Sequence, residues 1–218
     1  MVTWSEASWE NARQVFRLLE GRALKAALVL DSLYVADASE KEWWASYAVA
    51  EFGDSPNYLR QDGQPLVMIY AAPIDFSLPG VALRNVYWTI NYAQGVNTFN
   101  PYGMLLPRDW SFWEESPQQV VNGVVPVLPG YRDDHLDRAF SMAHPRNGGE
   151  FYHQQWQRAL SLRPETVLVY SWNEHFEETG IEPTVAWGDL YMQWTACYIR
   201  HAHAGTIGDC QPEEGNPE

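Results

Sequence analysis

The chain has 218 residues, 46 % of them apolar, which is enough to bury a substantial core in one domain. Its formal net charge of −14 argues against a nucleic acid partner, since phosphates require a basic surface, and it equally disfavours an anionic membrane surface. No apolar run reaches the ~20 residues of a membrane span. Residues 1–6 show no signal-peptide pattern, so the compartment stays undetermined.

Five segments have the composition of strands, and four have the 3.6-residue spacing of amphipathic helices. The strands are expected at 24–30, 65–71, 86–91, 120–128 and 166–172. The helices are expected at 6–20, from a capping box at 39–42 to Gly53, at 149–162, and from near Trp187 to Gly205. The region 93–118 is irregular. Strands that alternate with helices predict parallel βαβ units.

Periodicity also predicts which helix faces are buried. The first helix should bury Trp9, Ala12, Phe16 and Leu19. The second should present Trp43, Tyr47 and Ala50 on one stripe. The last should keep one face made of Trp187, Leu190, Tyr191, Trp194 and Tyr198.

Cysteine and histidine positions give no metal pattern. Cys197 lies in the last predicted helix and Cys210 in the polar segment after it. Two free thiols are the favoured interpretation, and a disulfide that pins this segment is the alternative that the sequence leaves open. His201 and His203 are two apart on a helix and diverge by about 200°, so they do not share an ion easily. We therefore expect no metal and no cofactor.

The strand at 166–172 is followed by an unusual concentration of acids. Glu174, Glu177, Glu178 and Glu182 lie within nine residues of the chain. Grouping like charges beside a buried strand is costly, because each raises the pKa of the others. A glycosidase needs this arrangement, since one protonated and one ionised carboxyl must face the same sugar.

Residues 171–183 read S-W-N-E-H-F-E-E-T-G-I-E-P, which resembles the signature S-[WF]-N-E-W-x-E-G-T-x-I-E-P of glycoside hydrolase family 99 and its clan. The upstream segment 127–134 resembles the clan's P-G-Y-D-D loop. Residues 146–152, with Trp156, resemble its R-x-G-x-x-Y-x-x-x-W segment. The resemblance covers roughly the last ninety residues well.

The resemblance implies an α/β fold of the (β/α)₈ TIM-barrel type, which takes ~250 residues and eight strands. Five of the eight βα units are visible, and six if segment 2–4 closes an early strand. We therefore expect an N-terminally truncated, partial barrel domain at 1–205 and a disordered tail at 206–218. Either the missing N-terminal segment or self-association through open strand edges would then complete the sheet.

The resemblance also implies an activity and its residues. It implies a retaining endo-α-mannosidase-like hydrolase, in which Glu174 acts as base on the sugar's 2-hydroxyl and Glu177 is the acid/base. Contacts to the glycan substrate are expected from Asn173, His175, Tyr131, Asp31, Tyr34 and Trp172. For Tyr131 a core role is equally favoured, and for Trp172 packing in the barrel is favoured over stacking on a sugar.

Two positions depart from the clan pattern, so functions other than hydrolysis are also considered. Glu178 stands where Gly is usual, so it must accept a positive φ or mark a different loop path. His175 stands where Trp is usual and can still donate to a sugar. Glu182 is expected to accept backbone N–H groups of its loop. The alternatives to a hydrolase are a non-catalytic carbohydrate-binding relative and an inactive barrel fragment.

Overall fold

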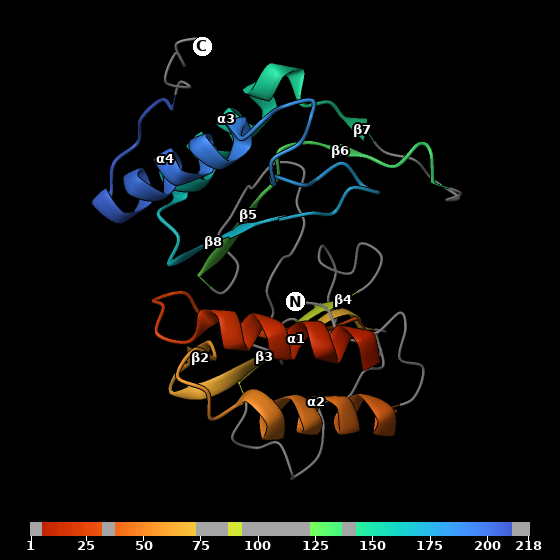
Figure 1. Cartoon of the computed structure of the whole chain (residues 1–218). Coiled ribbons are helices and arrows are strands. Elements are labelled where there is room, and N and C mark those ends of the chain that lie inside the picture. Colours follow the sequence, from red (N-terminus) through yellow and green to blue (C-terminus); the bar gives the residue numbers. More distant parts are fainter. Residues whose placement is uncertain (1–5, 32–37, 73–86, 93–122, 137–142, 211–218) are drawn as a thin grey trace. The chain divides into compact units, whose positions relative to one another are not determined.

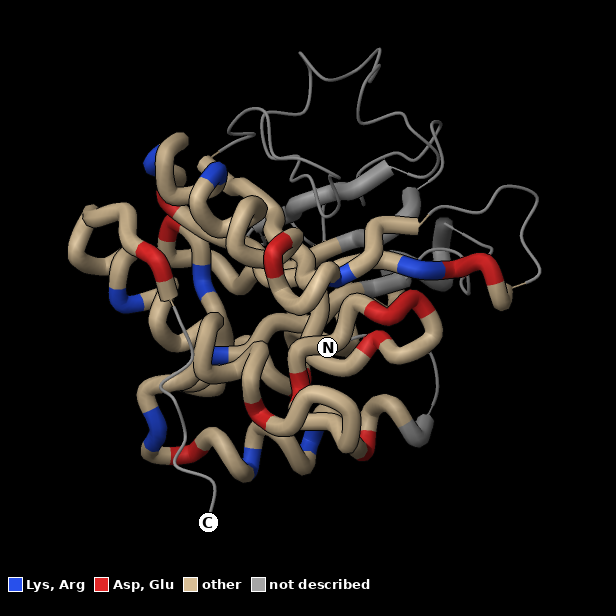
Figure 2. The backbone as a smooth tube through the Cα atoms, turned by 90° about the horizontal axis from the view of Figure 1, so that it is seen from above, with Lys and Arg blue, Asp and Glu red and all other residues tan. Residues whose placement is uncertain are grey.

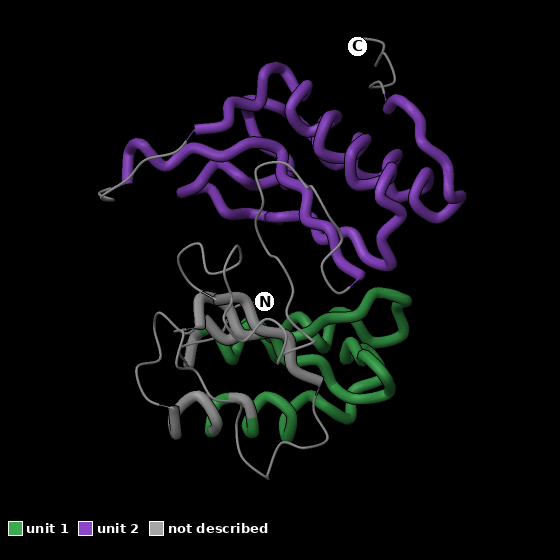
Figure 3. The backbone as a smooth tube through the Cα atoms, turned by 180° about the vertical axis from the view of Figure 1, so that it is seen from behind, with its two compact units in different colours: residues 1–110 green, residues 111–218 purple. Residues whose placement is uncertain are grey.

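The computed structural model describes residues 6–31, 38–72, 87–92, 123–136 and 143–210 (Figure 1). The chain divides into two compact units, Met1–Trp110 and Ser111–Glu218 (Figure 3), which we call the N-terminal and C-terminal units. Acidic and basic positions are interspersed along the described backbone (Figure 2). No helix in the described part of the chain is long and apolar enough to cross a bilayer. Each unit is considered by itself.

The sheet of the N-terminal unit is built on its longest strand, β3 (Gln64–Ala72). Strands β1 (Leu28–Asp31) and β4 (Tyr87–Tyr92) both pair with β3 in parallel. The short strand β2 (Arg60–Gln61) pairs antiparallel with the start of β3. Helix α2 (Ala38–Phe52) lies between β1 and β3 in the sequence, as a parallel crossover requires.

Helix α1 (Glu6–Leu19) buries the face predicted from its periodicity. Trp9 stacks on Trp44 at 5.1 Å between ring centroids, and Phe16 stacks on Phe52 at 4.7 Å. Phe16 also stacks on Tyr58, whose hydroxyl donates to the Leu66 carbonyl in β3. Aromatic pairs of this kind contribute about 0.5–1.5 kcal/mol beyond their buried area. The helix is thereby joined to the sheet.

The stripe predicted for α2 is correct for Tyr47, which packs edge-on against Trp9 at 4.8 Å, and wrong for the other two residues. Trp43 is 55 % exposed and Ala50 is also exposed, whereas Ala48 and Phe52 are buried. The aromatic side chains of α1 decide the orientation, because Trp44, and not its neighbour Trp43, stacks on Trp9. Two consecutive tryptophans fit either register, so the sequence alone could not distinguish them.

The C-terminal unit contains a second parallel pair. Strand β5 (Val124–Val127) pairs in register with β8 (Thr166–Val169), and helix α3 (Glu150–Leu162) lies between them in the sequence. A short antiparallel pair, β6 (Tyr131–Arg132) and β7 (Ala143–His144), follows β5. A 3₁₀ turn at Asn147–Gly149 leads into α3. The last helix, α4 (Leu190–Ala204), completes the unit.

Helices α3 and α4 pack through aromatic side chains. Trp156 stacks on Tyr198 at 5.3 Å, and Tyr191, Trp194 and Tyr198 of α4 are all buried, as predicted. Trp187 lies before the helix and is exposed. Gly149 precedes α3 with φ of +101°, and a Cβ there would overlap the Trp194 ring. Only glycine therefore allows this approach of α4.

A disulfide joins Cys197 in α4 to Cys210. The favoured interpretation of two free thiols is therefore wrong, and the alternative is correct. Gly205 ends α4 with φ of +65°, and the chain then returns along the helix until Cys210 enters the hydrophobic core. The sequence could not decide the pairing, because it depends on this return path. Residues 211–218 of the predicted tail lie outside the described residues.

The secondary structure agrees with the sequence prediction in its main features. All five predicted strands and all four helices are present, and every pairing among β1, β3, β4, β5 and β8 is parallel. The described strands form three small sheets, and no closed barrel is visible among the residues that the structure describes. The partial barrel and its domain boundaries stay predictions, and segment 2–4 lies outside the described residues.

Protonation of His153 links folding to pH. Burial lowers the pKa of His153 below its ordinary value, and its ring packs against Trp194 at 4.5 Å while Nδ1 is 2.7 Å from the Tyr198 hydroxyl. Below about pH 6.5 this histidine is protonated in the unfolded chain but stays neutral in the folded chain. The free energy of unfolding therefore decreases as the pH falls through this range. We expect His153→Gln to lose less unfolding free energy than wild type between about pH 7.5 and pH 5.5 in urea titrations.

The matched control is His203→Gln, at an exposed position of α4. It should keep the pH dependence of wild type. If the free energy of unfolding decreased equally with falling pH in His153→Gln and in wild type, burial of this imidazole would not contribute to the pH dependence.

Candidate functional site

The site predicted from the sequence lies where β5 and β8 end. Because the two strands are parallel, the loops that follow them leave from the same edge of the pair. The ladder continues by one bond, from the Tyr170 N–H to the Val127 carbonyl at 2.9 Å. The loop at 128–133 follows β5, and the loop at 171–182 follows β8; we call the latter the acidic loop.

The acidic loop closes on itself like a narrow hairpin. The Ser171 N–H donates to the Thr179 carbonyl at 2.9 Å, and the Thr179 N–H donates to the Glu174 carbonyl at 3.1 Å. The hydroxyls of Ser171 and Thr179 are 3.0 Å apart. The Ile181 N–H returns to the Ser171 carbonyl at 3.1 Å. Thr179 and Ile181 are buried, so the returning arm is anchored in the unit.

Both predicted catalytic carboxylates are half-buried and hydrogen-bonded near the strand end. The backbone N–H of Glu174 donates to Ser171 Oγ at 2.9 Å, and Glu174 Oε1 accepts from the Phe176 N–H at 3.2 Å. Glu177 lies in the turn at 175–178, and its Oε2 accepts from the Tyr170 hydroxyl at 2.9 Å. Hydrogen bonds of this kind restrict the carboxylates to a few orientations.

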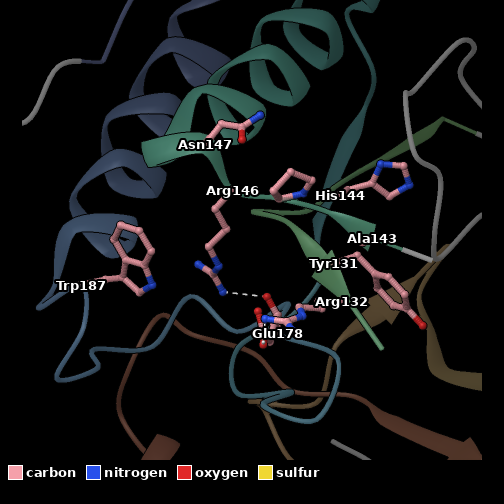
Figure 4. Close-up of a pocket in the computed structure, with 9 residues that line it drawn as sticks. Tyr131, Arg132, Ala143, His144, Arg146, Asn147, Glu178 and Trp187 are labelled. Atoms are coloured by element: carbon pink, nitrogen blue, oxygen red, sulfur yellow. Dashed lines mark hydrogen bonds and ion pairs between the residues drawn. The ribbon is translucent and has the colours of Figure 1, made fainter. Parts of the chain in front are cut away.

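The loop after β5 is joined to the acidic loop. The Arg132 N–H donates to the Glu177 carbonyl at 3.0 Å. Tyr131 is buried, and its hydroxyl is 2.9 Å from Asp133 Oδ2. Both loops border a pocket of about 440 Å³ (Figure 4). Its lining residues are Tyr131, Arg132, Ala143, His144, Pro145, Arg146, Asn147, Glu178 and Trp187.

Arg146 holds the returning arm of the acidic loop. Its Nη2 donates to the carbonyls of Glu178 at 2.8 Å and Gly180 at 2.7 Å, the first of which is drawn in Figure 4. The guanidinium carbon lies 4.4 Å from the centroid of the Tyr191 ring in α4. One side chain therefore connects the loop to the helix through two charge-assisted bonds and a cation–π contact.

Glu178 has the left-handed backbone conformation expected at a position where the clan signature has Gly. Its φ is +52°, in the left-handed region where the clan usually has Gly. The turn therefore follows the path predicted for glycine, and Glu178 accepts the strain. The carboxylate lines the pocket and lies 4.0 Å from Arg132 Nη1. Arg132 also binds Asp134 at 2.7 Å and lowers the pKa of that carboxyl.

The remaining predicted residues of the acidic loop are exposed. Trp172 is 53 % exposed, and Asn173 and His175 are exposed as well. His175 Nε2 contacts the Glu182 carboxylate across the loop. Glu182 was expected to bind backbone N–H groups, but its partner is a side chain of the same loop. Its role is structural, as predicted, because this contact joins the two arms of the loop.

Two predicted contacts lie outside this loop and its neighbours. Asp31 is the last residue of β1 in the N-terminal unit, where its backbone pairs with Tyr70, and its side chain is not described. Tyr34 lies outside the described residues. The structure thus brings together five predicted residues on the acidic loop and places Tyr131 in the loop beside it. Whether these residues contact a glycan stays a prediction.

Sequence reasoning did not assign three contributors to the site. Tyr170 was assigned to the strand, and its proximity to Glu177 follows only from the closed turn. Arg146 belonged to a recognised segment, yet nothing in that segment indicated its two carbonyl partners. Thr179 belongs to the recognised signature, in which no role was predicted for it. A threonine eight residues after Ser171 could have suggested the hydroxyl pair that closes the loop.

Solved structures of one enzyme share the fold of this chain. Two structures of the GH99 endo-alpha-mannosidase from Bacteroides thetaiotaomicron, one of them in complex with bis-tris-propane, align over 94 % of this chain with a TM-score of 0.72 and 17 % identity. The alignments cover 74 % and 78 % of those chains. No family model matches the chain, and no curated protein matches it in sequence.

The chain therefore has a glycoside hydrolase-like α/β fold, and the structural resemblance to family 99 predicted from its sequence is confirmed. At 17 % identity this likeness concerns the fold. Residue roles and activity need separate support, because one fold can carry many functions.

Replacing Glu178 by Gly tests whether backbone strain is present in the turn. A left-handed residue with a side chain costs about 1–2 kcal/mol, and the added freedom of glycine in the unfolded chain returns part of this. The exposed pair with Arg132 adds little. We expect Glu178→Gly to raise the free energy of unfolding by roughly 0.5–1 kcal/mol in urea titrations.

The control is Glu165→Gly, an exposed glutamate of the same unit without a positive φ. It should lower stability by about 0.5–1 kcal/mol. A similar loss in Glu178→Gly would contradict the account and indicate that the Glu178 carboxylate holds the turn.

Proposed function

We propose that this protein is a glycoside hydrolase acting on α-linked glycans, endo-α-mannosidase-like and retaining. The observation that carries the proposal is the acidic loop at the end of β8. It holds Glu174 and Glu177 half-buried and hydrogen-bonded, in a chain whose fold matches the GH99 endo-alpha-mannosidase structures over 94 % of its length. Carboxyl ends of parallel strands are the usual place for catalytic residues in such enzymes.

In the proposed mechanism Glu174 is the base. It removes the proton from the 2-hydroxyl of the sugar, whose oxygen attacks the anomeric carbon and forms an epoxide-like intermediate. Glu177 protonates the departing glycosidic oxygen and then deprotonates the water that opens the intermediate, so the configuration is retained. The bond from Tyr170 engages one oxygen of Glu177. This arrangement limits the rotation of the carboxyl and favours a fixed direction of proton transfer.

Substrate contacts are proposed on the same edge. Exposed Trp172 offers a flat face for a sugar ring, and Asn173 and His175 offer hydrogen bonds. Tyr131 lines the adjoining pocket. A glycan contact from Asp31, the last residue of β1 in the N-terminal unit, stays a prediction, as does the partial barrel of residues 1–205. The glycan is the proposed partner, and the barrel arrangement belongs to the proposal.

A second candidate is a carbohydrate-binding relative without turnover. The exposure of Trp172 at 53 % and Phe176 at 71 % favours it. These rings lie two residues before and two residues after Glu174 in the sequence, and exposed rings can hold a glycan that is not hydrolysed. The two candidates differ in what Glu177 does. In a binding protein the wild type hydrolyses no glycan, so replacing Glu177 has no effect on hydrolysis.

The test is hydrolysis of internal α-linked mannooligosaccharides by wild type, Glu174→Gln and Glu177→Gln. General acid–base groups contribute ~10²–10⁴-fold, so each variant should lose kcat by that order. An aryl α-mannoside with a good leaving group needs little protonation. Glu177→Gln should therefore regain part of its activity on that substrate, and Glu174→Gln should not.

The matched control is Glu165→Gln, before β8 and away from the acidic loop. It should keep wild-type kcat, and all variants should keep the wild-type circular dichroism spectrum. Retained glycan binding with no turnover by wild type on any α-mannoside would favour the binding protein. Equal activity of wild type and Glu177→Gln would contradict the assignment of the acid/base.

A further inference from the structure

The disulfide in the C-terminal unit lies beside a histidine that the proposed hydrolysis does not use. Cys197 and His201 are four residues apart in α4, so their side chains share one face of the helix. Cys210 returns to the same place. One ligand atom from each of the three residues lies within 4.8 Å of the others. This group differs from the pair His201 and His203, which the sequence analysis excluded.

One ring nitrogen of His201 is hydrogen-bonded, which leaves the second nitrogen for coordination. Nδ1 is 2.8 Å from the Thr206 hydroxyl, and the Thr206 N–H donates to the His201 carbonyl at 3.0 Å. If Nδ1 carries the proton, Nε2 keeps the lone pair that a metal requires. A hydrogen bond on the other ring nitrogen is the usual support of a metal-binding histidine.

The segment that carries Cys210 is held by contacts other than the disulfide. Gly208 passes so close to the His201 ring that a Cβ there would overlap it. Gln157 Nε2 donates to the Gly208 carbonyl at 3.3 Å and also contacts the Asp209 carboxylate. Cys210 itself is 1 % exposed and belongs to the core cluster. Reduction of the disulfide would therefore leave the two sulfurs close together.

We propose that the reduced protein binds a zinc-class cation through Cys197, His201 and Cys210. Two thiolates and one imidazole are a ligand set typical of Zn²⁺, with water in the fourth position. The Cα atoms of the cysteines are 5.9 Å apart, and side-chain rotation lets the sulfurs separate to the ~3.8 Å that tetrahedral Zn–S bonds of ~2.3 Å require. The ligand atoms lie within 4.8 Å of one another, so the His nitrogen must approach by at most about 1 Å.

Solvent reaches the histidine of the proposed site, and the site depends on redox state. His201 and Thr206 line a pocket of about 410 Å³, which gives solvent access to the imidazole. The disulfide and the metal exclude each other, because the same sulfurs form either the S–S bond or the metal–sulfur bonds. A trialkylphosphine with one water breaks the S–S bond and yields two thiols and the phosphine oxide. Metal binding then releases the thiol protons.

The experiment is a Co²⁺ titration of the full chain, before and after reduction by a trialkylphosphine. The reduced wild type should bind one Co²⁺, with a thiolate-to-cobalt charge-transfer band and the intense d–d bands of tetrahedral coordination. The oxidised protein should show neither band. Competition with Zn²⁺ should remove the signal. Zinc should also raise the thermal unfolding midpoint of the reduced protein.

His201→Ala and His203→Ala are the decisive pair of variants, since both lie near the end of α4 and only His201 belongs to the group. His201→Ala should weaken Co²⁺ binding at least about tenfold, the loss that outer-shell changes alone can cause. His203→Ala should bind as wild type does. Absence of the charge-transfer band in the reduced wild type would overturn the proposal. Equal affinities of the two variants would do so too, since an unfolded chain could use either histidine.

Discussion

The site depends on one constraint, the parallel pairing of β5 with β8. It brings the loops after both strands to one edge, although about forty residues separate the strands in the sequence. The bond from the Arg132 N–H to the Glu177 carbonyl is a direct consequence. Arg146 adds a second connection, from the segment before α3 to the returning arm of the acidic loop. Without the pairing, the acidic loop would lose its connection to the loop after β5.

The departures from the family 99 pattern can now be interpreted physically. Glu178 keeps the left-handed backbone expected of glycine, so the substitution changes the chemistry of the adjoining pocket while the turn keeps its path. His175 replaces an apolar ring with one that binds Glu182 across the loop. Both changes add polar contacts to the acidic loop. They distinguish the surface of this loop from that of the family pattern.

Local patterns predicted the elements well, and features set by distant contacts were not predictable. The run before Tyr170 identified β8, and the aromatic spacing of α4 identified its buried face. Trp43 and Ala50 were wrongly placed on the buried face of α2, because stacking of Trp44 on Trp9 of another helix decides the orientation. The sequence did not decide between free thiols and a disulfide, because the pairing depends on the path of the chain after Gly205. Of the candidate site, sequence reasoning found the acidic loop but neither the hydroxyl bond from Tyr170 nor the carbonyl contacts of Arg146.

The central claim is that the acidic loop hydrolyses an α-linked glycan with retention through the neighbouring 2-hydroxyl. The most direct measurement is proton NMR of the first product formed from an internal α-linked mannooligosaccharide, recorded before mutarotation. The account predicts that the α anomer appears first, because two successive inversions occur at the anomeric carbon. Initial formation of the β anomer, or no cleavage of any α-linked glycan, would contradict it.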